Sequence, residues 1–419
     1  MNQLEKRIIT KIEGHGKVNI NLAQKKAKLE IDEGERLFEG LVIGRPYNDA
    51  PYITSRICGV CPTSHLLASI KAIESAFQIQ PDERTILLRR LILAGQICQS
   101  HILHLYFLAL PDYLKIQSSL DMPEKFPEQF ANGIKLKRLF DEFIEIIGGR
   151  AVHPLTPTIG GFTKLPTANQ LYILRDKLED NLEVALETIK LFAGFHYPII
   201  TRETEMMALK NDETYPMYDG IVWTSEGEGF APSNYQNEIE EIVKNNSSAK
   251  FSIRKNKYKN GFIVGSRARM AMFADYLNPK TKKEYLASSG KIGPANPFFN
   301  NLAQAIEVTH FMEESIILID KIASLINENI TFKVIPKAGI GTGAVEAPRG
   351  ILYHQYEFDS NGKIIRADII TPTAQNLTSI EDDIEALLLH ATGLENDRIE
   401  KLVNMLIRAF DPCITCSVH

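Results

Sequence analysis

Two CxxC cysteine pairs, placed near opposite ends of the 419-residue chain, limit what this sequence can fold into. The first pair lies in the segment RICGVCPTSH (Arg56–His65) and the second lies in DPCITCSVH (Asp411–His419). Thiolates are soft ligands, and a CxxC turn directs both sulfurs at one ion. The four thiols are therefore compatible with a structural zinc site, a redox dithiol or a catalytic transition metal.

Three features favour a catalytic metal over structural zinc. Zinc ribbons usually bring their cysteine pairs within about 20 residues of each other, whereas these pairs join the two extremes of a chain with a large core. Chain ends normally fray, so Cys416, close to the end, indicates a terminus that is held in the interior. Arg56, His65 and Asp411 also surround the thiols with hydrogen-bonding groups that could tune a metal.

Composition excludes several classes of protein. A net charge of −5, with no run of six like charges, gives no reason to expect nucleic acid as a partner. The basic segment Lys244–Asn260 is interpreted as a solvated surface hairpin, with docking of an acidic partner as the alternative. No stretch approaches the roughly 20 apolar residues of a membrane span. The N-terminal segment lacks a secretory signal, and five cysteines are too few for a disulfide framework, so we expect a cytoplasmic protein with reduced thiols.

Hydrophobic periodicity predicts an α+β fold that is predominantly helical, in one domain over residues 1–419. Alternating runs in KVNINLA and KAKLEID predict a small antiparallel sheet near the N-terminus. A second hairpin is predicted in ILYHQYEFDSNGKIIRADII, around Asn361 and Gly362. Long buried helices are predicted at residues 64–77, 82–110, 126–147, 167–195, 298–326, 380–389 and 397–408, the second of them ending at Pro111.

The cysteine segments, taken together, resemble the large subunit of nickel-iron hydrogenases. Supporting segments occur in the order that this family shows: KIEGH, RLFEGLVIGRP, HILHLYFLALPD, EAPRG and TPTAQN. The resemblance extends from residue 8 to residue 419. It implies a catalytic subunit that cleaves dihydrogen reversibly and heterolytically.

The resemblance also implies a ligand set. Cys58 and Cys413 would be terminal ligands of nickel, and Cys61 and Cys416 would bridge nickel to an iron that carries cyanide and carbon monoxide. Four anionic sulfurs would keep the nickel electron-rich and leave one thiolate free to accept a proton.

Three further residues match positions that act on this centre in the family. Glu13 corresponds to the carboxylate that takes a proton from the terminal thiolate; without the family it would be an exposed residue at a strand end. Arg349 corresponds to the arginine above the open metal position, the alternative being a surface arginine beside a turn. Thr373 corresponds to a residue that hydrogen-bonds a cyanide, although a Thr-Pro-Thr turn needs no ligand to explain it.

Other matches concern the surroundings of the centre. Glu39 and His419 correspond to ligands of a buried Mg²⁺ ion. His65 is expected to donate a hydrogen bond to a bridging thiolate, and its alternative role is capping of the following helix. We place His104 near the site. The remaining two residues, His101 and Cys98, are interpreted as core packing.

One departure from the family pattern concerns Ser100. Many periplasmic members have an aspartate at this position, near the arginine. The segment SHILHLYFLALPD instead resembles the matching segment of cytosolic, bidirectional members, which are coupled to pyridine nucleotides or other soluble carriers.

The sequence also predicts partners. Once four cysteines hold the metal, only Cys98 remains, which is too few for an iron-sulfur cluster, and no GxGxxG stretch follows a strand to bind a dinucleotide. We therefore expect a small subunit with an iron-sulfur cluster, and further flavin and iron-sulfur subunits that pass electrons to a carrier such as NAD(P).

Two rival functions differ from this one. A metal-free, quinone-site subunit related to respiratory complex I would have lost the cysteine pairs, and a zinc-stabilised assembly subunit would lack catalysis. The family matures by removal of a C-terminal extension after the histidine, so we expect a processed chain that ends at His419.

Overall fold

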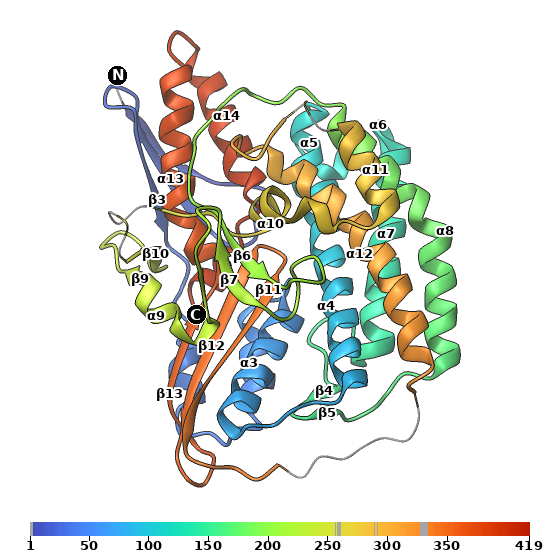
Figure 1. Ribbon diagram of the computed structural model, residues 1–419. Helices are drawn as coiled ribbons and strands as arrows, with labels where there is room; N and C mark the ends of the chain where they lie inside the picture. The colour runs from blue at the N-terminus through green and yellow to red at the C-terminus, as the bar shows by residue number, and fades with distance from the viewer. Residues whose placement is uncertain (1–2, 256, 258–260, 289, 291, 327–333) are drawn as a thin grey trace.

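Four long helices form the largest hydrophobic core. They are α4 (Glu83–Leu103), α7 (Pro127–Gly148), α8 (Ala168–Ala193) and α12 (Phe299–Ala323), and they lie together on one side of Figure 1. The computed structural model describes residues 3–255, 257, 261–288, 290, 292–326 and 334–419. Helix α8 begins with a capping box in which Thr167 and Gln170 satisfy each other's backbone N–H groups. The fold is α+β and predominantly helical, as the sequence predicted.

The helical stretch that begins with α4 continues beyond the end that the sequence predicted. A π-helical turn, η2 (His104–Ala109), leads into α5 (Leu110–Tyr113), so Pro111 lies in the first turn of α5 instead of ending the helix. Proline is tolerated there because the first N–H groups of a helix have no intrahelical partner. By length and composition alone the stretch Glu83–Tyr113 could cross a membrane, which was not expected from the sequence, but 83% of its apolar window is buried inside the protein.

A three-stranded antiparallel sheet lies beside this bundle. Its strands are β11 (Gly339–Ala347), β12 (Gly350–Phe358) and β13 (Ile364–Ile370), with β12 in the centre. The hairpin between β12 and β13 turns at Asn361 and Gly362, where it was predicted. Helix α3 (Pro62–Phe77) packs against β11. Two glycines of β11, Gly341 and Gly343, leave room for the α3 backbone.

The two ends of the chain share a second core. Strands β1 (Gln3–Ile8), β2 (Gly16–Asn21) and β3 (Lys26–Ile31) form the N-terminal sheet, of which β2 and β3 were predicted and β1 was missed. Leu29 and Ile31 of β3 belong to one hydrophobic cluster with residues of α13 (Pro372–His390) and α14 (Asn396–Ala409). Figure 1 shows these blue and red segments side by side. The N-terminal segment is therefore packed against the C-terminal helices.

Short elements connect these layers. The helices are α1 (Phe38–Val42), α2 (Ala50–Thr54), η1 (Ser55–Ile57), η3 (Ser119–Asp121), α6 (Met122–Lys125), η4 (Pro232–Asn234), α9 (Tyr235–Glu238), α10 (Ser266–Phe273), η5 (Ala274–Tyr276), α11 (Pro279–Ser288) and α15 (Ile414–Ser417). The strands are β4 (Pro157–Thr158), β5 (Gly161–Phe162), β6 (Met207–Lys210), β7 (Ile221–Thr224), β8 (Gly229–Phe230), β9 (Ile239–Ile242) and β10 (Phe251–Arg254).

The basic segment Lys244–Asn260 is only partly the solvated hairpin that was expected. Strands β9 and β10 do pair antiparallel, but all four residues of β10 are buried and the strand packs against α13. Within this segment, residues 256 and 258–260 lie outside the described residues.

Candidate metal centre

The two CxxC segments meet in the interior. The sulfur of Cys58 lies 3.2 Å from that of Cys413, and the sulfur of Cys61 lies 3.4 Å from that of Cys416. Cys413 and Cys416 are 3.1 Å apart, and all four sulfurs lie within 4.8 Å of one another. The thiols are buried and unbridged. The structure thus brings together the four cysteines that the sequence singled out.

Local backbone geometry aims the first pair at this point. Cys58 is extended and follows η1, and Cys61 immediately precedes α3, whose first residue is Pro62. The backbone N–H groups of Val60 and Cys61 both donate to the sulfur of Cys58, each at 3.2 Å. These donors and the positive end of the α3 dipole favour thiolates. The second pair follows Asp411, whose φ of 53° bends the chain between α14 and α15.

Glu13 contacts the second pair directly. Its Oε2 lies 3.0 Å from the sulfur of Cys413 and accepts a hydrogen bond from the backbone N–H of Thr415 at 3.1 Å. The N–H of Ile414 donates to the Glu13 carbonyl at 2.9 Å, so the two terminal segments are joined by backbone as well. Burial, followed by the charge of Cys413, raises the pKa of Glu13 to about 8. The side chain is partly buried, contrary to the exposed alternative.

Arg349 is buried beside the same cysteines. It is only 5% exposed, which excludes the alternative of a surface arginine. Its Nη2 donates to Asp411 Oδ1 at 2.7 Å and its Nη1 donates to Ser100 Oγ at 3.1 Å, while Nε donates to the Asp411 carbonyl. Burial lowers the pKa of this guanidinium, but Asp411 and the nearby thiols outweigh burial and leave it raised. A fixed cation therefore lies next to the sulfur cluster.

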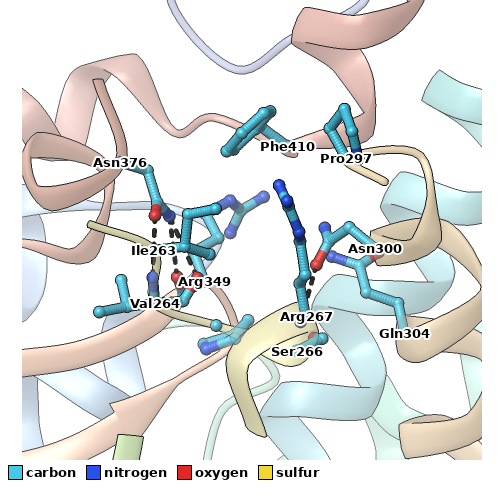
Figure 2. A pocket seen from close by; sticks show the side chains of 12 residues that line it. Ile263, Val264, Ser266, Arg267, Pro297, Asn300, Gln304, Arg349, Asn376 and Phe410 are labelled. Carbon is cyan, nitrogen blue, oxygen red and sulfur yellow. Dashed lines mark hydrogen bonds between the residues drawn. The ribbon is translucent and has the colours of Figure 1, made fainter. Parts of the chain in front are cut away.

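The backbone of Arg349 is held from behind by Asn376. The amide nitrogen of Asn376 lies 3.4 Å from the carbonyl oxygens of Arg349 and Val264, and its Oδ1 accepts from the Val264 N–H at 3.0 Å. Figure 2 shows these side chains in a small pocket that is also lined by Arg267 and Phe410. The position of the guanidinium is thus set by main-chain contacts in addition to Asp411.

His65 and Thr373 lie on the other side of the cluster. His65 is within α3, completely buried, and its Nε2 lies 3.9 Å from the sulfur of Cys416. Burial lowers the pKa of His65 to about 3, so the imidazole is neutral. Thr373 is in the first turn of α13, so the Thr-Pro-Thr segment begins a helix. Its hydroxyl oxygen accepts from the Cys413 N–H at 3.1 Å.

Glu39 and His419 also approach each other. His419 Nε2 lies 2.7 Å from the carbonyl oxygen of Ile369 and 3.9 Å from Glu39 Oε1, and Glu39 Oε1 accepts from the Ile369 N–H at 2.8 Å. The ammonium of Lys250 is 3.7 Å from Glu39 Oε2. A carboxylate, a carbonyl and an imidazole therefore converge near the C-terminus.

The other singled-out residues have structural partners. His104 contacts Gln304 and the carbonyl of Arg408, which places it behind the segment that leads to Cys413. His101 lies 2.8 Å from Glu307 in the core. The thiol of Cys98 is buried in the large core cluster.

Sequence reasoning missed several residues around the cluster. Arg36 donates to the carbonyls of Ile57 and Thr415 and so ties both cysteine segments together. His354 lies 3.0 Å from His65. Arg36 begins the family segment RLFEGLVIGRP, but nothing in that segment indicates its contacts, whereas the polar His354 in an otherwise apolar strand was a usable signal.

The donor set suits a soft transition metal. Burial raises the pKa of the Cys416 thiol, and an ion that binds thiolates reverses this effect because its charge stabilises the deprotonated form. Four sulfurs, a buried guanidinium and a carboxyl with a pKa near neutrality can hold a redox metal and move a proton beside it.

Comparisons with known proteins agree with this geometry. The model of the nickel-dependent hydrogenase family matches residues 36–135 and 214–419. The alpha subunit of sulfhydrogenase 1 from Pyrococcus furiosus is 36% identical over 416 residues, covering 98% of this chain and 96% of the relative. The matching subunit of the F420-non-reducing hydrogenase from Methanothermobacter marburgensis is 32% identical, covering 100% of this chain and 95% of the relative.

A solved structure shows the same fold over the whole length. The crystal structure of an NAD⁺-reducing NiFe hydrogenase in its H2-reduced state superposes with a TM-score of 0.88 at 25% identity, and all of both chains is covered. The family match favours the hydrogenase prediction over both the quinone-site subunit and the zinc-stabilised scaffold. With four buried thiols converging at the predicted place, the chain belongs to the nickel-dependent hydrogenases, as their catalytic subunit.

Proposed function

We propose that this chain cleaves and forms dihydrogen reversibly, with nickel and iron held by its four converging cysteines. Cys58 and Cys413 would be the terminal ligands of nickel, and Cys61 and Cys416 would bridge to the iron. The observation that carries this proposal is the convergence of four buried, unbridged sulfurs within 4.8 Å of one another. When bound, the nickel-iron centre, with cyanide and carbon monoxide on iron, supplies the redox site at which dihydrogen is split into two protons and two electrons.

Glu13 is the proposed base. Its carboxylate oxygen, 3.0 Å from the sulfur of Cys413, is close enough to receive a proton from that thiol. A pKa raised to about 8 lets the carboxyl both accept and release a proton near neutral pH. Its partial exposure gives the proton a direction of exit that the fully buried cysteines lack.

Arg349 and Thr373 would contact the ligands of iron. The guanidinium is charged at any ordinary pH and is held in one orientation by Asp411 and Ser100, so it can donate to a cyanide nitrogen and polarise dihydrogen. The Thr373 hydroxyl lies next to Cys413 and is proposed to donate to the other cyanide.

A magnesium ion is proposed between Glu39 and His419. Mg²⁺ prefers oxygen ligands together with several waters, and the Glu39 carboxylate and the Ile369 carbonyl provide two such oxygens beside the His419 imidazole. Such an ion would fix the C-terminal segment that carries Cys413 and Cys416.

Electrons are proposed to leave through a small subunit with an iron-sulfur cluster. Helix α1 and its flanks expose three large apolar side chains, Leu37, Leu41 and Ile43, next to Arg36, which contacts both cysteine segments. We propose further flavin and iron-sulfur subunits and a soluble carrier such as NAD(P), supported by the NAD⁺-reducing hydrogenase of the same fold. Unbridged cysteines are typical of reducing compartments, which supports a cytoplasmic location.

Metal analysis and isotope exchange test this function. The complex, purified without oxygen from its native source, should contain about one nickel per catalytic chain, together with iron from this centre and from the proposed iron-sulfur clusters, and should exchange dihydrogen with D2O. Zinc in place of nickel, or no transition metal at all, would contradict the proposal. Replacing any one of the four cysteines with serine should abolish exchange, because hard oxygen poorly replaces soft sulfur.

A further inference from the structure

A chain of buried polar side chains leads from the thiol cluster into the β11–β13 sheet. His65 Nε2 lies 3.9 Å from the sulfur of Cys416, and His65 Nδ1 lies 3.0 Å from His354 Nε2. His354 Nδ1 lies 2.7 Å from the hydroxyl oxygen of Tyr356, and that hydroxyl is placed to donate to Ser69 Oγ at 3.1 Å. The two histidines, Tyr356 and Ser69 are all completely buried.

The direction of every hydrogen bond in this chain follows from its first member. A metal-bound Cys416 is a thiolate, which can only accept, so the proton of His65 must be on Nε2. A neutral imidazole has one N–H, so His65 Nδ1 is an acceptor and His354 must donate from its own Nε2. His354 Nδ1 is then an acceptor as well, so a thiolate at Cys416 requires the Tyr356 O–H to turn from Ser69 Oγ to His354 Nδ1.

We propose that His354 and Tyr356 are positioning residues that hold His65 in its Nε2–H tautomer, so that it donates to the bridging sulfur of Cys416. This inference rests on the proposed function, because it takes Cys416 as a metal ligand. Hydrogen bonds to a ligand sulfur withdraw electron density from the metal and so tune its redox properties.

The burial of Tyr356 and Ser69, at the end of the hydrogen-bonded row that is remote from the thiols, indicates that this row positions His65 and does not conduct protons. Tyr356 and Ser69 are fully buried, so a proton that moved along this chain would not reach water at its end. Glu13, by contrast, lies on the Cys413 side of the cluster and is partly exposed. The His65 chain therefore sets an orientation, and the proton leaves by way of Glu13.

The β11–β13 sheet keeps the hydrogen-bonded side chains of His354 and Tyr356 in fixed positions. His354 and Tyr356 are two positions apart in β12, so they share one face of the strand, and β12 is paired on both sides by β11 and β13. The ring planes of His65 and His354 are inclined at 68°, with their centroids 5.3 Å apart, so the rings meet edge to face while their nitrogens meet. The paired strand therefore fixes the positions of the His354 and Tyr356 side chains, whose hydrogen bonds select the tautomer of His65.

Neutron diffraction on crystals of the complete wild-type complex tests the tautomers directly. We expect deuterium on Nε2 of both His65 and His354, and on the Tyr356 oxygen in the direction of His354. Deuterium on Nδ1 of either histidine would overturn the proposal. The result is separate from the proposed function, because any thiolate-bound metal at Cys416 requires the same tautomers, whereas the identity of the metal is decided by elemental analysis.

The variant Tyr356→Phe tests the consequence for the metal. Without the phenol, His354 Nδ1 loses its donor, His65 donates less to the thiolate, and the iron becomes more electron-rich. We expect the carbon monoxide stretching band in the infrared spectrum to move to lower wavenumber at unchanged nickel and iron content. An unmoved band at full metal content would overturn the proposal.

Matched variants separate this effect from general damage to the strand. Tyr353→Phe removes a phenol that is also buried in β12 but whose hydroxyl has no hydrogen-bond partner among the described residues, so its band should stay at the wild-type position. His354→Gln keeps an N–H that can donate to His65 and should keep the band near that position. His354→Leu loses the donor and should shift the band as Tyr356→Phe does; equal positions for the Gln and Leu variants would count against the proposal.

Discussion

At the scale of single residues, Glu13 is the proposed proton acceptor, and its replacement tests whether turnover can be lost while the metal stays bound. Replacing it with glutamine keeps the shape of the side chain and its hydrogen bond with Thr415, but removes its affinity for a proton. We expect Glu13→Gln to lower exchange between dihydrogen and D2O by about 10²- to 10⁴-fold, the usual contribution of a general base, while nickel and iron stay bound. Full exchange activity in this variant would show that another group carries the proton.

Arg349 provides a second test at this scale. Arg349→Lys keeps a positive charge but replaces a planar guanidinium, which is held by three hydrogen bonds to Asp411 and Ser100, with a flexible point charge. We expect kcat to fall by about 100-fold or more, the typical loss when one preorganised donor is removed, at unchanged metal content. Normal turnover in the lysine variant would remove this residue from the mechanism.

The individual residues also show what the sequence could reveal. The four cysteines were found because their spacing carries the chemistry in the local sequence. Arg36 acts through tertiary contacts, in which its side chain reaches carbonyl groups far away along the chain, and such contacts leave no local pattern. His354 lies between these cases, because its polarity was visible but its partner, 289 positions away, was not.

At the scale of elements, the contact between β11 and α3 positions the first cysteine pair. A Cβ added at Gly343 would lie 2.6 Å from the Ala72 nitrogen and 2.8 Å from the Lys71 Cβ, so Gly343→Ala must push α3 away from the sheet. Such overpacking costs about 1–3 kcal/mol. We expect a lower Tm and reduced nickel content, because Cys61 lies at the start of α3.

Gly339 of the same strand is the control for this change. A Cβ there would meet the nearest atom, the Ala76 carbonyl oxygen, at 3.5 Å, an ordinary contact. Gly339→Ala should leave both Tm and nickel content close to those of the wild type. Equal effects of the two substitutions would show that close packing of β11 against α3 does not position the cysteine pair.

A buried ion network joins three further elements. Arg269 of α10 donates to Glu307 of α12 at 2.6 and 2.7 Å and to Glu346 of β11 at 2.8 Å, and all three side chains are fully buried. Arg269→Met would leave two buried carboxylates without their cation, which typically costs about 3–5 kcal/mol. Thermal unfolding should show this loss, whereas Arg175→Met, which removes an exposed pair with Asp320, should change stability by about 0.5 kcal/mol or less.

Element boundaries were predicted less well than element types. The long helices and the β12–β13 hairpin follow from periodicity and from the Asn-Gly turn, which are local signals. The continuation of α4 through Pro111 was missed because a π-helical turn resets the helix before the proline, so that the proline occupies a new first turn. Strand β11 was missed because its glycines, chosen by contact with α3, lower its apparent strand propensity.

At the scale of the whole molecule, the centre depends on the meeting of the chain's two ends. Cys413 pairs by backbone with Glu13, and the N-terminal sheet packs against α13 and α14. The sequence indicated this closure through the second CxxC pair and, by resemblance, through Glu13, which was placed beside a terminal thiolate. How the closure is built, from β3, α13 and α14, depended on long-range packing that periodicity cannot predict.

The exposed apolar surface near α1 is where the proposed small subunit is expected to bind. Leu41 is 51% exposed and lies in α1, which begins shortly after Arg36, the residue that contacts both cysteine segments. A charge placed there would have to be desolvated in an interface, so Leu41→Glu should release the proposed small subunit during oxygen-free purification, as measured by mass photometry. The released chain should keep its nickel but fail to reduce a soluble carrier with dihydrogen, because its electrons have no cluster to enter.

Leu389→Glu, at a leucine of α13 that is 59% exposed, should leave the complex intact. Reduction of the carrier by the monomeric chain alone would show that no partner is needed.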